Sequence, residues 1–168
     1  SIGGFDVAPT PTINANDVIS LYSDSYDNVP VEFFNGYWEP WQTTLSNDFV
    51  VSGNNMIHYT NFNFVGNQFG IPTVNATDYS NLHINIYLPE VPSNLDFLIT
   101  IKDFGADMLD GGGDDTTQQV FFDGDDFEEG AWSTLEIPVT MTTRNNIGQI
   151  IYENINGSSL SEFYIDNI

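Results

Sequence analysis

Residues 107–117, DMLDGGGDDTT, place four aspartates around three consecutive glycines. Carboxylates on a glycine-rich loop are oxygen ligands of the kind that calcium takes. The segment does not suit a phosphate group, because it has neither a lysine nor a following helix and its carboxylates repel anions. Its spacing matches no standard calcium loop, so the prediction of Asp110 and Asp114 as calcium ligands rests on composition. The alternative is a long turn in which the glycines reverse the chain.

A second group of acidic residues lies near the two ends of the chain. Asp24 and Asp27 follow the first expected strand, and Asp166 lies on the last one. If these two strands are neighbours, the carboxylates meet. A calcium ion would then offset their repulsion and tie the ends together.

Residue types needed for other chemistry are scarce. The chain has no cysteine, which excludes disulfides, thiol nucleophiles and thiolate metal sites. His58 and His83 are the only histidines, and neither a G-x-S-x-G nor an H-E-x-x-H motif occurs. Glycoside hydrolysis needs only two carboxylates, but most acidic residues lie in Gly- and Asn-rich stretches where burial is not expected. We therefore expect no enzyme activity.

The charge of the chain restricts its partners. Lys102 and Arg144 are the only Lys and Arg residues against 24 acidic ones, giving a formal net charge of -22. Such a surface repels nucleic acid, anionic membranes and sulfated or uronate polymers. No apolar run approaches the roughly 20 residues needed to cross a bilayer. An uncharged ligand or a divalent cation is the expected partner.

The composition predicts an all-β fold. Aromatic residues make up 14% of the chain, and β-branched residues occur in short runs bounded by turn formers. The length suits one domain. We assign residues 13–168 to a two-sheet β-sandwich, a jelly roll, and residues 1–12, with the stretch APTPT, to a linker remnant of a longer secreted protein. The expected strands are 18–23, 43–51, 55–62, 67–70, 81–89, 96–104, 117–123, 132–139, 148–154 and 162–168, with the first and last side by side.

Alternation in the stretch NLHINIYLP separates two faces of one strand. Ile84 and Ile86 point to one side, and His83, Asn85 and Tyr87 point to the other. The second side is either a solvated outer face or a ligand platform. In the following strand Lys102 lies on the non-core side, and it joins the same surface if the two strands are neighbours.

The stretch FFNGYWEPW, residues 33–41, contains two of the three tryptophans. Loops with so much ring area either plug the end of a sandwich or hold a ligand. Trp38 and Trp41 are therefore candidate binding residues. Trp132, at the start of an alternating strand, is expected to serve packing.

Several stretches together are similar to a known class of protein. APTPTINANDVISLYSDSYDNV, NLHINIYLP, KDFGADMLDGGGDDTTQQVFF, GAWSTLEIPV and FYIDNI resemble noncatalytic β-sandwich modules of marine Bacteroidetes polysaccharide-degrading proteins, which are similar to carbohydrate-binding modules of the family 4, 16 and 22 type. The resemblance implies a structural calcium ion at Asp24 and Asp166. It also implies glycan binding on a concave sheet or its rim, which we assign to His83, Asn85, Tyr87, Trp38 and Trp41.

The sequence therefore predicts a secreted or cell-surface carbohydrate-binding module that acts beside a catalytic domain of the same chain. The expected ligand is a neutral polysaccharide, first a β-glucan such as laminarin. The alternative is a calcium-stabilised spacer or adhesin-like sandwich that binds no sugar. Two aromatic rings projecting together from one non-core surface favour sugar binding, and rings that are all buried favour the spacer.

Overall fold

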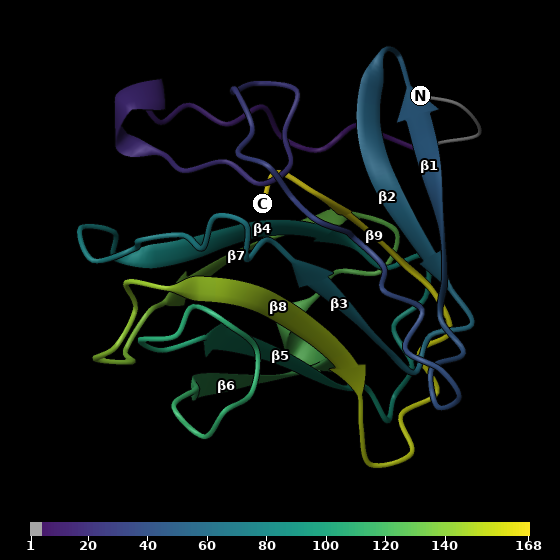
Figure 1. Ribbon diagram of the computed structural model, residues 1–168. Helices are drawn as coiled ribbons and strands as arrows, with labels where there is room; N and C mark the ends of the chain where they lie inside the picture. Colours follow the sequence, from purple (N-terminus) through teal and green to yellow (C-terminus); the bar gives the residue numbers. More distant parts are fainter. Residues whose placement is uncertain (1–4) are drawn as a thin grey trace.

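Two antiparallel sheets pack face to face in the computed structural model, which describes residues 5–168 (Figure 1). One sheet has the strand order β1-β2-β9-β4-β7 and the other β3-β8-β5-β6. This architecture confirms the prediction of a two-sheet β-sandwich. The strands are β1 (Leu45–Val51), β2 (Asn54–Thr60), β3 (Phe64–Gln68), β4 (Asn81–Tyr87), β5 (Asp96–Asp103), β6 (Thr116–Asp123), β7 (Trp132–Pro138), β8 (Ile147–Asn154) and β9 (Phe163–Asp166).

Nine of the ten expected strands are present, with shifted ends. The first expected strand, at residues 18–23, is wrong. Residues 18–23 form no strand, because their backbone pairs only at isolated points such as the bridge from Ser20 to Asn28. The expected contact between the two ends of the domain is confirmed. The amide of Leu21 donates to the carbonyl of Ile168 at 2.8 Å, and the amide of Ile168 donates to Tyr22 at 2.9 Å.

The core lies between the sheets and follows the alternation of each strand. Ile84 and Ile86 of β4 face Ile99 and the other inward residues of β5, and all three are fully buried. The core also contains a cluster of three polar side chains whose hydrogen bonds are made within the protein. The hydroxyl of Tyr152 donates to Asn67 at 2.8 Å, and the Asn67 amide donates to the Tyr59 hydroxyl at 2.9 Å. Paired in this way, these buried polar atoms help to fix the register of β2, β3 and β8.

Strands β4 and β5 are consecutive in the sequence but lie in different sheets. The surface on which Lys102 was expected to join His83 does not exist, because the two residues face opposite sides of the sandwich.

Of residues 1–12, assigned to a linker remnant, residues 1–4 lie outside the described residues, and residues 5–12 lie against the outer face of the five-stranded sheet. Ala8 is buried, the carbonyl of Asp6 accepts from the Trp132 indole at 2.7 Å, and that of Pro9 accepts from Asn167 at 3.1 Å. This part of the chain is therefore packed on the domain. The helical content of residues 5–168 is limited to two 3-10 turns, η1 (Ala15–Asp17) and η2 (Gly124–Asp126), and neither has the length to cross a membrane.

Candidate functional site

The outer face of the four-stranded sheet, here called the open face, carries three outward positions from each strand. They form a grid because the register aligns them across β3, β8, β5 and β6. The first row is Phe64, Glu153, Leu98 and Phe121; the second is Gly66, Ile151, Thr100 and Gln119; the third is Gln68, Gln149, Lys102 and Thr117.

An aromatic wall borders the open face at β3. The indole of Trp38 lies directly over Gly66, where a Cβ atom would overlap its six-membered ring. Trp38 also stacks on Phe64, with ring centroids 6.2 Å apart and an angle of 28° between the planes. Phe33 packs against the indole edge-on at 6.2 Å. Glycine at position 66 therefore lets a loop tryptophan settle on the sheet with one ring surface supported.

The middle of the open face is covered by side chains of the neighbouring strands. Leu98 and Thr100 point outward, yet they are only 5% and 6% exposed, because side chains of the neighbouring strands screen them. The hydroxyl of Thr100 is buried and has no hydrogen-bond partner in the described chain. A buried hydroxyl without a partner costs stability, and because this oxygen is covered, a ligand can reach it only if a neighbouring side chain moves.

Glu153 lies in the first row between Phe64 and Leu98. It is half-buried, and this burial raises the pKa of its carboxyl group. No hydrogen bond among residues 5–168 reaches its carboxylate. The two oxygens are therefore free to accept hydrogen bonds from a ligand that lies along the aromatic wall.

The third row closes one end of the open face. The Lys102 ammonium contacts Asp110 at 2.6 Å and Asp115 at 3.4 Å, and the Gln149 amide donates to Asp110 at 3.1 Å. Burial lowers the pKa of Lys102, but these two carboxylates more than offset it, so the pKa is raised. These contacts hold the glycine-rich loop on the sheet. Asp110, which was predicted as a calcium ligand, pairs with Lys102 and is not part of the carboxylate cluster in the loop.

The residues predicted from β4 do not lie on the open face. Asn85 is 1% exposed and accepts from the Asn167 amide at 2.8 Å, while Tyr87 is 8% exposed beneath Phe5, at 4.4 Å between centroids. His83 bonds Glu136 at 2.5 Å beside a mostly apolar cavity of about 420 Å³ under residues 9–13. These side chains do point away from the core, but Phe5 covers Tyr87, and Asn85 is buried against Asn167 at the wall of this cavity, so an exposed platform of all three is wrong.

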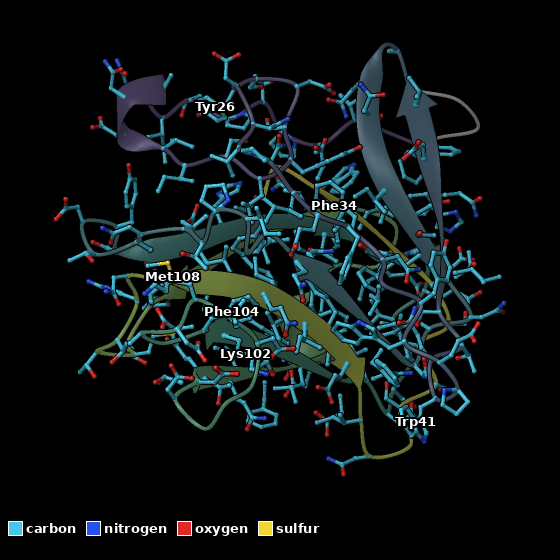
Figure 2. The ribbon with its side chains drawn as sticks, in the orientation of Figure 1. Tyr26, Phe34, Trp41, Lys102, Phe104 and Met108 are labelled. Atoms are coloured by element: carbon cyan, nitrogen blue, oxygen red, sulfur yellow. The ribbon has the colours of Figure 1, made fainter. Side chains whose placement is uncertain are left out.

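The two candidate tryptophans differ in their surroundings. Trp38 forms the wall described above. Trp41 is 73% exposed, and its carbonyl accepts from Asn63 at 2.8 Å, next to the end of β8. Figure 2 shows Trp41 and Lys102 toward opposite ends of β8. The expectation that segment 33–41 borders the same surface as His83, Asn85 and Tyr87 is wrong, because Trp38 packs on the other sheet.

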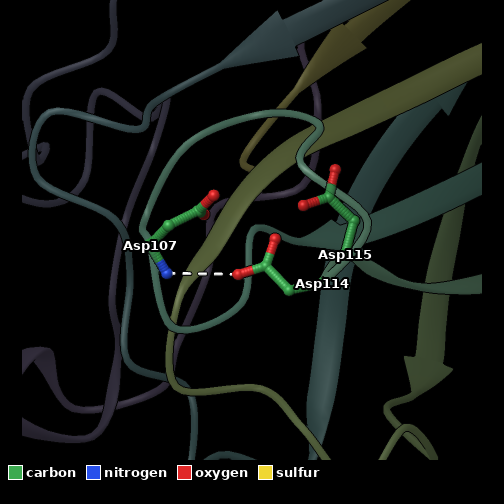
Figure 3. Close-up of side chains that lie close together, drawn as sticks. All are labelled: Asp107, Asp114 and Asp115. Carbon is green, nitrogen blue, oxygen red and sulfur yellow. Dashed lines mark hydrogen bonds between the residues drawn. The ribbon is translucent and has the colours of Figure 1, made fainter.

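The glycine-rich loop brings three carboxylates together (Figure 3). Oxygens of Asp107, Asp114 and Asp115 lie within 4.8 Å of one another. Asp114 was predicted for this site, and Asp107 and Asp115 join it in place of Asp110. Three carboxylates at this spacing fit a hard cation in charge and ligand type.

The acidic residues near the ends of the chain are held by amides. Asp166 is fully buried and accepts from the Asn54 side chain at 2.9 Å and from the amide of Asn167 at 2.7 Å. Asp24 accepts two hydrogen bonds from Asn55, at 2.6 and 2.8 Å. Burial, with a smaller effect of the Asp24 charge, raises the pKa of Asp166 to about 6. Asp27 is exposed and has no hydrogen bond or ion pair within residues 5–168.

Sequence reasoning missed most of the open face. Alternation in GQIIYEN places Gln149, Ile151 and Glu153 on one side, and TTQQVFFD places Gln119 and Phe121 opposite the core residue Val120. Applying the period of two to every strand, rather than to NLHINIYLP alone, would have found these residues.

Known structures share this architecture, although no protein-family model and no curated protein matches the chain. A crystal structure of a family 30 carbohydrate binding module matches with a TM-score of 0.63 and 12% identity, covering 89% of this chain and 85% of that one. This chain has the same fold. The family 30 module of a cellulosomal cellulase of Clostridium thermocellum gives a TM-score of 0.62 and 13% identity, over 89% and 94% of the two chains. The β-sandwich implied by the resemblance is thereby confirmed, and the marine Bacteroidetes link stays a prediction.

Proposed function

We propose that this protein is a noncatalytic carbohydrate-binding module whose open face binds a neutral polysaccharide, first a β-glucan such as laminarin. The observation that carries the proposal is the pairing of a tryptophan ring supported by the sheet with an unpaired carboxylate on one non-core surface. Trp38 lies half-buried on Gly66, and the Glu153 carboxylate makes no hydrogen bond in the described chain. The fold shared with family 30 modules is consistent with this role.

Each part of the open face matches one property of a sugar. The apolar CH surface of a pyranose ring stacks on an indole, and hydroxyl groups at its edge need polar partners. Glu153 can accept from two hydroxyls, and Gln119 can both donate and accept. A glycan lying along the first two rows would meet the Trp38 ring at one end and the exposed ring of Phe121 at the other.

Charge favours an uncharged glycan over an anionic one. The single ammonium near the face, on Lys102, is already shared by Asp110 and Asp115, and the molecule carries a formal net charge of -22. A uronate or sulfate group would therefore meet Glu153 and a negative field without a free cation to pair with.

The proposal is tested by affinity electrophoresis of the whole protein in gels that contain laminarin, xylan, hydroxyethylcellulose or alginate. We expect retardation by a neutral glycan, strongest with laminarin, and none by alginate. If no neutral glycan slows the protein, the binding function is wrong and the spacer alternative is favoured. Retardation by alginate alone would overturn the assignment of a neutral ligand.

The proposal also covers the domain beside which the module acts and the location of the protein. A domain that holds a polysaccharide without changing it is useful beside a catalytic domain, because tethering raises the effective concentration of the substrate. We propose that such a domain belongs to the same chain and that the protein is secreted or displayed on the cell surface, where polysaccharides are found.

We also propose that the glycine-rich loop binds calcium through Asp107, Asp114 and Asp115. The three carboxylates repel one another, and a divalent cation would neutralise them and stiffen the loop that closes the third row. Removing calcium with excess EGTA should lower the melting temperature by several degrees, and added calcium should restore it. Asp114→Asn should abolish the calcium response, whereas Asp27→Asn should leave it intact. An equal melting temperature with and without EGTA would contradict the proposal.

A further inference from the structure

An aromatic row crosses the outer face of the five-stranded sheet, on the side opposite the open face. It consists of His58, Tyr164, Tyr87 and Trp132, one residue from each of β2, β9, β4 and β7. The register places each of them directly opposite the next. Neighbouring strands are about 4.8 Å apart, so the row spans roughly 15 Å.

The rings of the row form a continuous surface. His58 stacks on Tyr164 at 4.0 Å with a 5° angle between the planes, and Tyr87 lies 5.8 Å from Tyr164 and 5.5 Å from Trp132. Phe49 of β1 extends the surface at 5.3 Å from Tyr164. All these side chains point away from the core between the sheets, so packing of the two sheets does not require them.

Of the polar atoms of the row, only the Trp132 indole N–H makes a side-chain hydrogen bond in the described chain, to the Asp6 carbonyl. Neither the Tyr87 nor the Tyr164 hydroxyl takes part in a hydrogen bond within residues 5–168. Nε2 of His58 is buried without a hydrogen-bond partner, and the nearest carboxylate, Glu162, is 3.8 Å away. Of these groups, His58 Nε2 is the buried polar atom that lacks a partner, and such an atom costs stability.

A single residue of the N-terminal segment covers the centre of the row. The ring of Phe5 lies 4.4 Å from Tyr87 and 4.7 Å from Tyr164, and it also touches Phe49 and Trp132. Phe5 packs against the buried cluster of Val51, Met56, Tyr87 and Tyr164, but the residues that follow it are little covered. Phe5 is only half-buried, Asp6 and Val7 are exposed, and the one side-chain hydrogen bond here joins Trp132 to the Asp6 carbonyl.

We propose that the aromatic row is a second glycan-binding surface, which Phe5 closes and which a neutral glycan chain opens by taking the place of the Phe5 ring. The choice of a glycan rests on the proposed function, but the surface is independent of the open face. A pyranose ring would replace one ring-on-ring contact with another, and its hydroxyls would supply partners for Tyr87, Tyr164 and His58. Because Phe5 competes with the ligand, the affinity of the row is reduced by the fraction of molecules in which Phe5 is bound.

The test uses the third tryptophan as a reporter. Trp38→Ala together with Trp41→Ala removes the wall of the open face and leaves Trp132 as the only tryptophan in the chain. In this background, Phe5→Ala should let laminarin or hydroxyethylcellulose change the Trp132 fluorescence at a concentration at least about tenfold lower than with Phe5 present. The factor follows from the loss of one buried phenyl contact. Adding Tyr87→Leu, which keeps an apolar side chain but removes the ring, should abolish the change.

Deletion of residues 1–6 is the second variant, and it should behave as Phe5→Ala does. Circular dichroism and the melting temperature identify which variants are folded. A folded variant of either kind that shows no fluorescence change and no gel retardation with laminarin, hydroxyethylcellulose or xylan overturns the second surface. That result leaves the open face untouched, because the Trp38→Ala, Trp41→Ala background in which it is obtained lacks the wall of the open face.

Discussion

Replacing Gly66 by alanine is expected to weaken glycan binding about tenfold, although the new methyl group lies under the binding surface rather than on it. A Cβ atom at this position overlaps the six-membered ring of Trp38, so the indole must leave its seat on β3. Removing a central tryptophan from a binding surface typically costs at least about 2 kcal/mol, close to 30-fold in affinity. Displacing the ring without removing it should cost part of that amount, and Trp38→Ala should cost all of it.

The measurement is isothermal titration with the neutral glycan that retards the wild-type protein most. Gly124→Ala is the matched control, because a Cβ atom there meets only ordinary contacts at 3.4 Å or more and the residue lies off the open face. Unfolding in urea separates lost binding from lost stability. If Gly66→Ala binds as tightly as wild type, Trp38 does not serve as the stacking surface, and the assignment of the open face loses its main support.

The alternation of apolar residues and the positions of turn formers were sufficient to predict most of the fold. Alternation identified the inward residues of β4 and β5, and turn formers located nine strands within a few residues. The prediction of a strand at residues 18–23 was wrong. The sequence VISLYS has strand composition, but its backbone pairs with Asn28 and Ile168 and not with a neighbouring strand. That choice is made by tertiary contacts between distant parts of the chain, which intrinsic strand propensity does not contain.

The candidate site was harder to predict because alternation gives the two faces of a strand but not what covers them. Tyr87 and Asn85 point outward, as expected, but Phe5 covers Tyr87 and Asn85 is buried against Asn167. Trp38 was recognised as a candidate, but its partner on the sheet is a glycine, which carries no periodic signal. The missing information was the assignment of each strand to a sheet, and consecutive strands such as β4 and β5 belong to different ones.

The stability of the protein in chelator is expected to rise as the pH falls from 7 to 5, because of Asp166. Burial raises the pKa of this carboxyl group in the folded state to about 6, from an ordinary value of 3.8. Between these values the folded protein holds a proton that the unfolded chain has released, so folding is penalised as the pH rises and the full penalty is present above about pH 6. At about 1.4 kcal/mol for each unit, the penalty at pH 7 is on the order of 2 to 3 kcal/mol.

Urea denaturation in EGTA at pH 5 and pH 7 measures about half of this penalty, roughly 1.4 kcal/mol, because the part that builds up between pH 3.8 and pH 5 is present at both values. Asp166→Asn should remove most of the difference, because the amide has no charge to bury, while Asp27→Asn should leave it unchanged, since Asp27 is exposed and makes no contact within residues 5–168. Repeating the series in saturating calcium tells whether the cation reaches this carboxylate. A cation bound at Asp24 and Asp166 would abolish the penalty at pH 7, whereas a cation confined to the glycine-rich loop would raise stability at both pH values and preserve the difference. A stability that is equal at the two pH values in EGTA would mean that the Asn54 and Asn167 donors already compensate the buried charge.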